Sequence, residues 1–272
     1  MERGNDLMKI KSFELPPVES HQDGLPIYFL TGKNHFYQTL FCIQSLDKNS
    51  TQKFRYTLVD DGSFNESLIE QLKRKLPNVR IVGMDEINQN VERHLPEEDY
   101  PKLRYKRIEY PHIRKLTDIH TIDGDDWKIV FDSDMLFWSA PNEIIDWIRN
   151  PTMPIHMIDC VEAYGYSLTL MEELAKEKIK KRLNVGVIGL NSKAINWNKL
   201  ESWTENMESR EGKSYYLEQA LSAMLIGSQY SLALNSESYI VNPQPTDKGI
   251  LHHYVDYSKK TYQTEKWIKI LE

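Results

Sequence analysis

Short apolar segments alternate with segments of helical periodicity along the first third of this 272-residue chain. Residues 26–31, 54–59 and 79–82 have the composition of buried strands, while residues 35–46 and 66–76 place apolar side chains at helical spacing. Strands that are separated by helices usually pair in parallel through right-handed crossovers. The alternation therefore predicts an α/β fold with a mostly parallel central sheet flanked by helices.

The rest of the chain continues this pattern without a repeat or a clear linker. A helical stretch at residues 102–122, interrupted at Pro111, precedes an apolar strand at residues 128–131, and the charged segment 161–182 is expected to be a mobile flap that becomes helical at 171–181. Further elements are expected as strands at 154–158, 184–190, 231–235 and 250–255 and as a helix at 215–226. We therefore expect a single Rossmann-like domain at residues 26–256, between a polar lead-in (1–25) and a lysine- and aromatic-rich tail (257–272).

The composition narrows the possible partners and the compartment. Lysine and arginine total 34 against 40 aspartates and glutamates, a formal net charge of −6 without a basic block, which argues against nucleic acid as a partner. The only cysteines, Cys42 and Cys160, predict neither a disulfide framework nor a thiolate metal site. No signal peptide is recognisable, nor any apolar run of the roughly 18 residues needed to span a bilayer. We expect a cytoplasmic protein without a transmembrane segment; attachment to a membrane by other means stays open.

Two aspartates directly follow the apolar strand at residues 128–131. Asp132 and Asp134 both reach one cation if the chain turns at the strand end, and Mg²⁺ and Mn²⁺ accept such oxygen ligands. Asp123 and Asp125 have the same spacing but lie in a polar, glycine-containing turn. The Asp132–Asp134 pair is enclosed by apolar residues, where charges are costly unless paired or metal-bound. We therefore predict a metal site there, suited to neutralise the charge of a departing nucleoside diphosphate.

Five segments resemble, in the right order, motifs of the nucleotide-diphospho-sugar transferases of the GT-A fold, and most closely those of family 8, the glycogenin-like group. The segments are 58–63 (LVDDGS), 129–134 (IVFDSD), 184–187 (NVGV), 218–219 (EQ) and 253–259 (HYVDYSK). The resemblance implies a GT-A domain and a metal-dependent glycosyltransferase with Mn²⁺ or Mg²⁺ as cofactor. It would move a hexose from a nucleotide diphosphate sugar, most simply a UDP-sugar, to a saccharide, lipid-linked or protein hydroxyl.

The resemblance also implies roles for individual residues. His253 would be the third metal ligand beside Asp132 and Asp134; neighbours in a strand point to opposite faces, so His252 cannot face the same ion. Lys259 would bind the donor diphosphate, and the tail around it would pack on or close over the donor site. Further donor-binding candidates lie at strand ends and on the helical stretch before the metal strand: Thr31, Lys33, Asp60, Asp61, Arg107, Arg114, Lys115 and Ser133.

The catalytic candidates are Asn184, Glu218 and Gln219. The family 8 likeness implies retention of configuration, in which case Glu218 or Gln219 positions and polarises the donor sugar. The Asp-Asp-Gly-Ser stretch at 60–63 is more typical of family 2 enzymes, which invert, and inversion would make Glu218 a general base. The sequence departs from the family 8 pattern at four further positions: Glu218 replaces an aspartate, Asp256 a glycine, and Lys260 and Thr261 a Pro-Trp pair.

Two other functions remain open from the sequence. A sugar-phosphate nucleotidyltransferase also combines a Rossmann-like sheet with metal-binding aspartates, but residues 30–35 lack the glycine-rich, arginine-containing loop that such enzymes carry after the first strand. A non-catalytic nucleotide-sugar-binding module of the same fold would keep the metal residues and lose the chemistry. Hydrolysis of a UDP-sugar without acceptor distinguishes an enzyme from such a module.

Overall fold

The structure, a computed structural model, describes residues 2–272 and is built around a seven-stranded sheet. The strands lie in the order β3-β2-β1-β4-β7-β6-β8, and β1 to β4 are parallel, whereas β7 is antiparallel to both β4 and β6. They are β1 (Leu25–Thr31), β2 (Phe54–Asp60), β3 (Arg80–Val82), β4 (Trp127–Phe131), β6 (Ile155–Ile158), β7 (Leu183–Asn191) and β8 (Leu232–Ala233). The predicted α/β fold with a mostly parallel sheet is confirmed.

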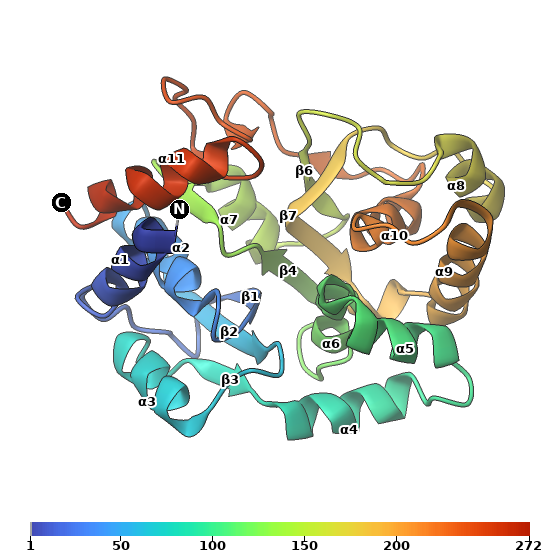
Figure 1. The fold of residues 1–272 in the computed structure, drawn as a ribbon, viewed down its shortest axis with the longest axis horizontal. Helices are drawn as coiled ribbons and strands as arrows, with labels where there is room; N and C mark the ends of the chain where they lie inside the picture. The colour runs from blue at the N-terminus through green and yellow to red at the C-terminus, as the bar shows by residue number, and fades with distance from the viewer. Residues whose placement is uncertain (1) are drawn as a thin grey trace.

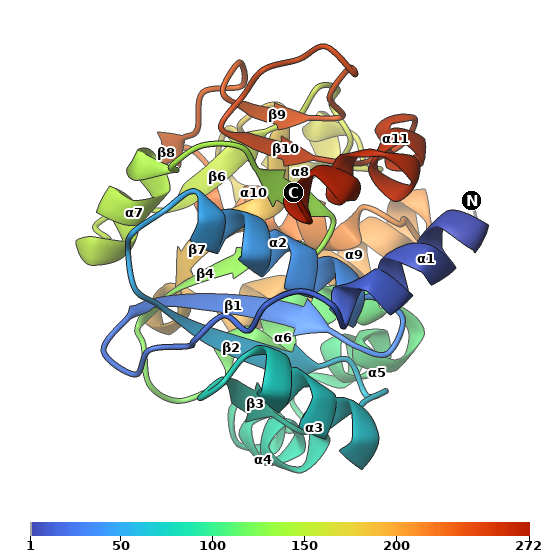
Figure 2. The same ribbon diagram turned by 90° about the vertical axis from the view of Figure 1, so that its left-hand side faces the viewer.

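Helices cover both faces of this sheet (Figures 1 and 2). They are α1 (Glu2–Ser12), α2 (Phe36–Lys48), α3 (Glu66–Lys75), α4 (Met84–His94), α5 (Pro101–Glu109), α6 (Arg114–His120), α7 (Asn142–Arg149), α8 (Leu168–Ala175), α9 (Trp197–Glu211), α10 (Leu217–Ile226) and α11 (Ser258–Thr264), with short 3-10 turns η1 (Pro111–Ile113), η2 (Ser192–Ala194) and η3 (Lys266–Ile270). Alternate residues of β4 enter different cores: Ile129 and Phe131 pack with α2 and α7, and Val130 with α6 and α10.

A second, three-stranded sheet brings the C-terminal third of the chain to the end of β4. It consists of β5 (Met135–Phe137), β10 (Leu251–His253) and β9 (Tyr239–Val241). β10 is antiparallel to β5 and pairs His253 with Met135, and the amide of Tyr254 donates to the carbonyl of Asp134. The strand expected at 250–255 therefore forms, but it adds to this small sheet and not to the central one.

Both ends of the chain pack on the same side of the molecule. The lead-in contains α1, which contacts α2 and α11, and the tail forms α11 and η3 (Figure 1). Trp267 of η3 is buried against Phe41 of α2, with ring centroids 5.3 Å apart. The division at residues 25 and 257 remains a prediction. No helix within residues 2–272 combines the length and apolar character that crossing a membrane requires.

Some helices differ from those expected. The composition predicts a helix at 171–181, but α8 occupies Leu168–Ala175. The helix begins earlier because the Ser167 hydroxyl caps its first turn, and it ends earlier because Lys176 adopts a left-handed conformation. The helix expected at 102–122 is divided into α5, η1 and α6 around Pro111. The elements expected from the sequence do not include the helices α1, α4, α7, α9 and α11.

Candidate active site

Asp132, Asp134 and His253 meet at the carboxyl end of β4, and their candidate ligand atoms all lie within 4.8 Å of one another. The Nε2 atom of His253 lies 3.6 Å from Asp132 Oδ2 and 3.3 Å from Asp134 Oδ1. Adjacent ligands of an octahedral ion with bonds of about 2.1 Å lie about 3.0 Å apart. Two carboxylates and one imidazole at these separations fit Mg²⁺ or Mn²⁺ after small side-chain rotations.

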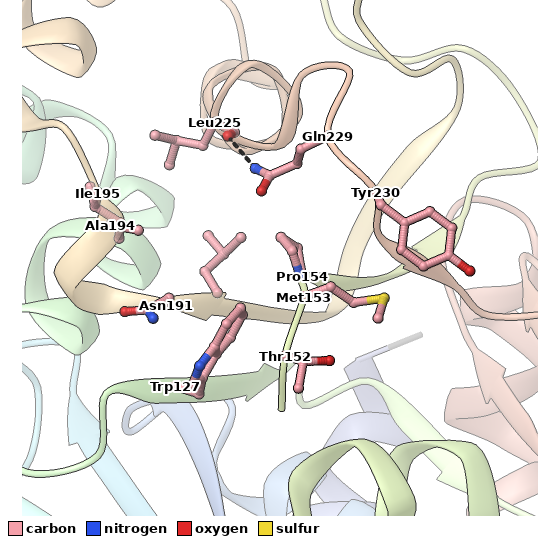
Figure 3. Close-up of a pocket in the computed structure, with 11 residues that line it drawn as sticks. Trp127, Thr152, Met153, Pro154, Asn191, Ala194, Ile195, Leu225, Gln229 and Tyr230 are labelled. Atoms are coloured by element: carbon pink, nitrogen blue, oxygen red, sulfur yellow. Dashed lines mark hydrogen bonds between the residues drawn. The ribbon is translucent and has the colours of Figure 1, made fainter. Parts of the chain in front are cut away.

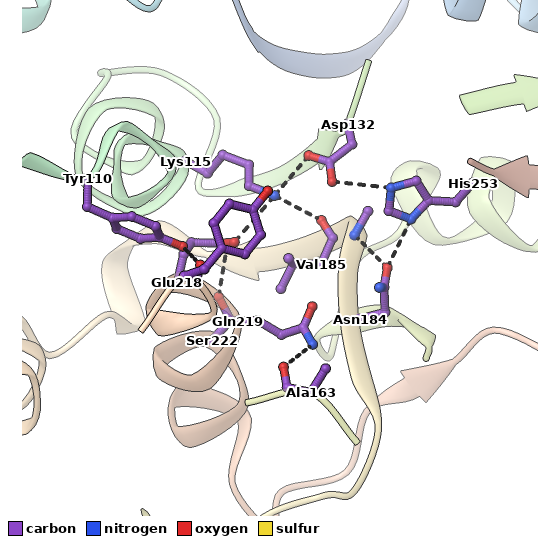
Figure 4. A network of polar contacts seen from close by, with 12 residues as sticks. Tyr110, Lys115, Asp132, Ala163, Asn184, Val185, Glu218, Gln219, Ser222 and His253 are labelled. Carbon is purple, nitrogen blue, oxygen red and sulfur yellow. Dashed lines mark hydrogen bonds and ion pairs between the residues drawn. The ribbon is translucent and has the colours of Figure 1, made fainter. Parts of the chain in front are cut away.

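The second ring nitrogen of His253 faces the amide oxygen of Asn184 at 3.3 Å (Figure 4). That oxygen also accepts a hydrogen bond from the Gly186 amide at 2.9 Å. With a metal ion on the aspartates, a proton on Nδ1 donated to Asn184 would leave the lone pair of Nε2 free to bind that ion, as in many histidine metal ligands. Asn184 of β7 thereby orients the ring of His253, although the two residues are 69 positions apart in the chain.

Gly186 is required for this arrangement because a larger residue would collide with the histidine. A Cβ atom at this position would lie 2.4 Å from His253 Nδ1 and 3.0 Å from Asn184 Oδ1. We expect Gly186→Ala to displace the His253 ring and to weaken Mn²⁺ binding by roughly 10- to 100-fold, the usual effect of disturbing a residue that orients a ligand. Calorimetric titration of Mn²⁺ measures this loss.

Gly83→Ala is the matched control, since a Cβ at Gly83 meets no atom within 4 Å. Its Mn²⁺ affinity should equal that of the wild type. Equal affinities of all three proteins would show that the position of His253 does not matter for the metal.

Two lysines form ion pairs with the aspartates. Lys115 of α6 is buried and places Nζ 2.8 Å from Asp132 Oδ1, and Lys259 of α11 places Nζ 3.4 Å from Asp134 Oδ2. Burial opposes ionisation of Asp134, but the hydrogen bond and charge of His253 and the charge of Lys259 together hold its pKa below the usual range. The Lys259 side chain is 47% exposed, so it is free to move from the carboxylate to an incoming anion.

Glu218 lies in the first turn of α10, buried beside Lys115 (Figure 4). Its Oε2 is 3.3 Å from Lys115 Nζ, and its Oε1 accepts from the Ser222 hydroxyl at 3.3 Å. Burial raises the pKa of Glu218 to about 7, although Lys115 acts in the opposite direction. A carboxylate whose pKa is strongly raised and which lies near other ionisable side chains is typical of active sites.

Asp159 joins the catalytic candidates and is a residue that the sequence reasoning missed. Its Oδ2 accepts hydrogen bonds from Asn184 Nδ2 at 2.9 Å and from Gln219 Nε2 at 3.3 Å. Gln219 also donates to the Ala163 carbonyl at 2.7 Å. Asp159 follows the last residue of β6, so the signal that singles out Asp132, a carboxylate after an apolar strand, was available for it as well.

The ends of β1 and β2 form the opposite side of the site. The Asp61 carboxylate lies against the bare Cα of Gly32, where a Cβ would be 2.0 Å from Asp61 Oδ1. Asp60 is buried and accepts from the backbone amides of residues 62–64, so it stabilises the turn. Lys33 has an exposed side chain, and its amide donates to the Ser63 hydroxyl.

Hydrogen-bonded hydroxyl groups connect β1 to the loop that carries Asp132 and Asp134. Thr31 and Ser133 both share hydrogen bonds with the hydroxyl of Thr39, each 2.8 Å long.

The two arginines among the candidates make different contacts. Arg114 donates to the carbonyls of Asp61 and Arg107. The Arg107 guanidinium is bound to Asp118 at 2.6 and 3.0 Å, in a buried ion pair. The structure thus brings Lys115 to the metal cluster, places Arg114 at the end of β2, and leaves Arg107 in a structural pair.

A separate hollow of about 460 Å³ opens near the start of β4, at the other end of the strand from the metal cluster (Figure 3). Trp127 lines it from β4, and Leu225 and Gln229 lie opposite, in and just after α10. In open parallel sheets, ligands bind outside the carboxyl ends of the strands, which is where the metal cluster lies. The geometry therefore assigns the chemistry to the cluster and not to this hollow.

No family model and no curated protein matches the sequence. The structure is similar to a galactosyltransferase, LgtC, in complex with donor and acceptor sugar analogues (TM-score 0.60, 14% identity, 90% of this chain and 94% of that chain). It is also similar to mouse xyloside xylosyltransferase 1 (0.55, 12%, 87% and 98%) and to the glycosyltransferase GlyE of Streptococcus pneumoniae TIGR4 (0.56, 12%, 91% and 62%). The chain therefore has the GT-A fold of these glycosyltransferases, as expected from its sequence motifs.

Proposed function

We propose that this chain is a metal-dependent glycosyltransferase that moves a hexose from a nucleotide diphosphate sugar, most simply a UDP-hexose, to a hydroxyl acceptor. The observation that carries the proposal is the cluster of Asp132, Asp134 and His253 at the carboxyl end of β4, within a GT-A fold. Lys259 and Lys115 stand beside this cluster as cations for an anionic donor. The acceptor belongs to the saccharide, lipid-linked or protein hydroxyls.

The site residues divide between the two halves of the donor. Asp132, Asp134 and His253 would hold Mn²⁺ or Mg²⁺, which neutralises the negative charge that builds on the departing diphosphate. Lys259 adds a mobile positive charge on the exposed side of the same phosphates. The Asp61 carboxylate, at the end of β2, is the candidate acceptor for hydrogen bonds from the base or ribose.

The polar group of Asp159, Asn184 and Gln219 would bind the hydroxyls of the donor sugar. Their side chains are already hydrogen-bonded to one another and buried, so they offer fixed donors and acceptors that need little reorganisation. We propose that the reaction retains configuration and that Glu218 positions and polarises the sugar. The anomeric configuration of the new glycosidic bond, determined by NMR, tests this: an inverted product would make Glu218 the candidate base.

Calorimetric titration of UDP with and without Mn²⁺ tests the donor class. We expect Mn²⁺ to strengthen UDP binding by at least about tenfold, because the ion joins two carboxylates to the diphosphate. GDP and CDP are the matched comparison for the base. Absence of UDP binding under both conditions would contradict the proposed donor, and tight binding without slow hydrolysis of UDP-hexose would indicate a binding module and not an enzyme.

A further inference from the structure

Three aromatic rings form a surface beside Glu218, which we call the aromatic shelf: the half-buried Tyr110 and the exposed His112 and Tyr215. The ring centroids of His112 and Tyr215 are 5.0 Å apart, those of Tyr110 and His112 5.3 Å, and those of Tyr110 and Tyr215 6.5 Å. Tyr215 is 65% exposed although its ring contacts Tyr110, His112 and Tyr216. A large aromatic side chain that is both ordered by its neighbours and open to solvent is a ready contact surface.

Two contacts join the chain segments that form the aromatic shelf, the segment between α5 and η1 and the segment before α10. The Tyr110 hydroxyl donates to the carbonyl of Tyr215, which ties the residue before η1 to the segment before α10. Lys213, two residues before Tyr215, forms an ion pair with Glu109 of α5. The Tyr215 ring meets Tyr110 at 81°, His112 at 72° and Tyr216 at 88°, so none of the three rings lies parallel to it.

The shelf borders the catalytic candidates. Tyr215 precedes Glu218 by three residues, and the ring of Tyr110 lies next to Glu218 (Figure 4). Burial raises the pKa of Tyr215, and the charges of Lys259, Asp132 and Asp134 also act on its hydroxyl. The shelf therefore lies at the edge of the metal cluster, whereas Asp61 and the ends of β1 and β2 form the side assigned to the base.

The chemistry of the shelf suits a neutral ligand. Burial and the charge of Lys115 lower the pKa of His112, so this ring is uncharged at neutral pH. Tyrosine and histidine combine a flat apolar face with a polar edge. A pyranose has the complementary surface, with C–H groups on its faces and hydroxyls around its rim.

We propose that the aromatic shelf binds the acceptor and that this acceptor is a saccharide, its ring stacked on Tyr215 with a hydroxyl directed toward Glu218. The inference rests on the proposed glycosyl transfer and selects one of the three acceptor classes. Tyr105 of α5 is a further exposed ring: it is 51% exposed, and its centroid lies 5.9 Å from Nζ of Lys213, two residues before Tyr215.

Direct binding of saccharides tests the proposal independently of catalysis. A panel of neutral disaccharides of glucose, galactose and xylose is titrated into the protein loaded with UDP and Mn²⁺, and into the protein alone, with ligand-observed NMR as the readout. We expect at least one disaccharide to bind the wild type and Tyr215→Ala to weaken this binding by at least about tenfold, since the variant lacks the ring against which the sugar would pack. Tyr215→Phe should retain the affinity, because it preserves the ring face.

Tyr230→Ala is the matched control, since Tyr230 is 80% exposed and lines the separate hollow of Figure 3. It should bind the disaccharide like the wild type. Equal affinity of Tyr215→Ala and wild type, or no saccharide binding to the wild type, would overturn the proposal. UDP titration of the same proteins separates this proposal from the proposed donor. If Tyr215→Ala loses saccharide binding but still binds UDP, the result supports the aromatic shelf as the acceptor site. If the wild type binds saccharides but not UDP, the result refutes only the proposed donor.

Discussion

Asp134→Ala should abolish the Mn²⁺-dependent part of UDP binding and lower kcat/KM for glycosyl transfer roughly a thousandfold. Asp134 is the aspartate nearest to His253 and also the partner of Lys259, so its removal takes away one metal ligand and leaves the Lys259 ammonium without this carboxylate. A site with one carboxylate and an uncompensated ammonium group beside it binds a divalent ion poorly. Calorimetry of UDP with and without Mn²⁺ measures the first effect, and an assay of donor consumption measures the second.

The chain supplies a control with the same local sequence pattern. Asp123 belongs to the second Asp-x-Asp segment, its side chain is 69% exposed, and it pairs with Arg93 on the surface. Asp123→Ala should therefore leave UDP binding and transfer unchanged. If Asp134→Ala retained Mn²⁺-dependent binding while its thermal unfolding matched the wild type, the metal would have to lie elsewhere.

Glu218→Gln should lower turnover by roughly 10²- to 10³-fold while leaving the affinity for UDP nearly unchanged. Glutamine preserves the size of the side chain and its contact with Ser222, but it removes the negative charge beside Lys115. The effect is expected on kcat because the group is buried next to the site of reaction and does not belong to the diphosphate-binding residues. Steady-state kinetics, with UDP calorimetry on the same variant, separates the two quantities.

The pH profile gives a second measurement of the same residue. Burial raises the pKa of Glu218 to about 7, and the charge of Asp132 contributes to the increase. A metal ion on Asp132 reduces that contribution, so the inflection is expected at or below a pH of about 7. As the Glu218 carboxylate forms, kcat should rise with pH and reach a plateau above this inflection. This inflection should be absent from Glu218→Gln.

Glu66→Gln is the appropriate comparison for Glu218→Gln, because Glu66 also lies in the first turn of a helix but is exposed. A helix-start glutamate that acts only through the helix dipole contributes modestly to stability and nothing to turnover. If both variants showed wild-type kcat, Glu218 would be a structural residue and would leave the mechanism.

Local sequence patterns predicted the parallel part of the fold and the two aspartates at the centre of the candidate site. The alternation of apolar strands and helices predicted the parallel part of the sheet, because side-chain periodicity directly reflects which faces are buried. Asp132 and Asp134 were recognisable because a strand end within apolar sequence is an unusual place for two carboxylates. Their expected partner His253 came from a family motif near the far end of the chain, and the pairing of β10 with β5 explains how it reaches them.

The remaining contacts could not be predicted because they depend on pairing between distant segments. Arg107 and Lys115 fall in one expected helical stretch and look equally suitable as phosphate ligands, yet in the structure they lie on α5 and α6, where one is bound to Asp118 and the other to Asp132. Asp159 gains its place only when β6 and α10 bring it to Asn184 and Gln219. The aromatic shelf likewise joins residues about a hundred positions apart.

Local sequence accounts for the α/β architecture and for the position of the aspartate pair at a strand end. Those features follow from side-chain periodicity, which neighbouring residues control. Packing between distant segments sets which cation meets which carboxylate, which side chains gather around Asp159, why residue 186 is a glycine and which rings remain open to solvent. Such contacts form between side chains that are far apart in the chain, and their geometry is set by the packing of whole helices and sheets.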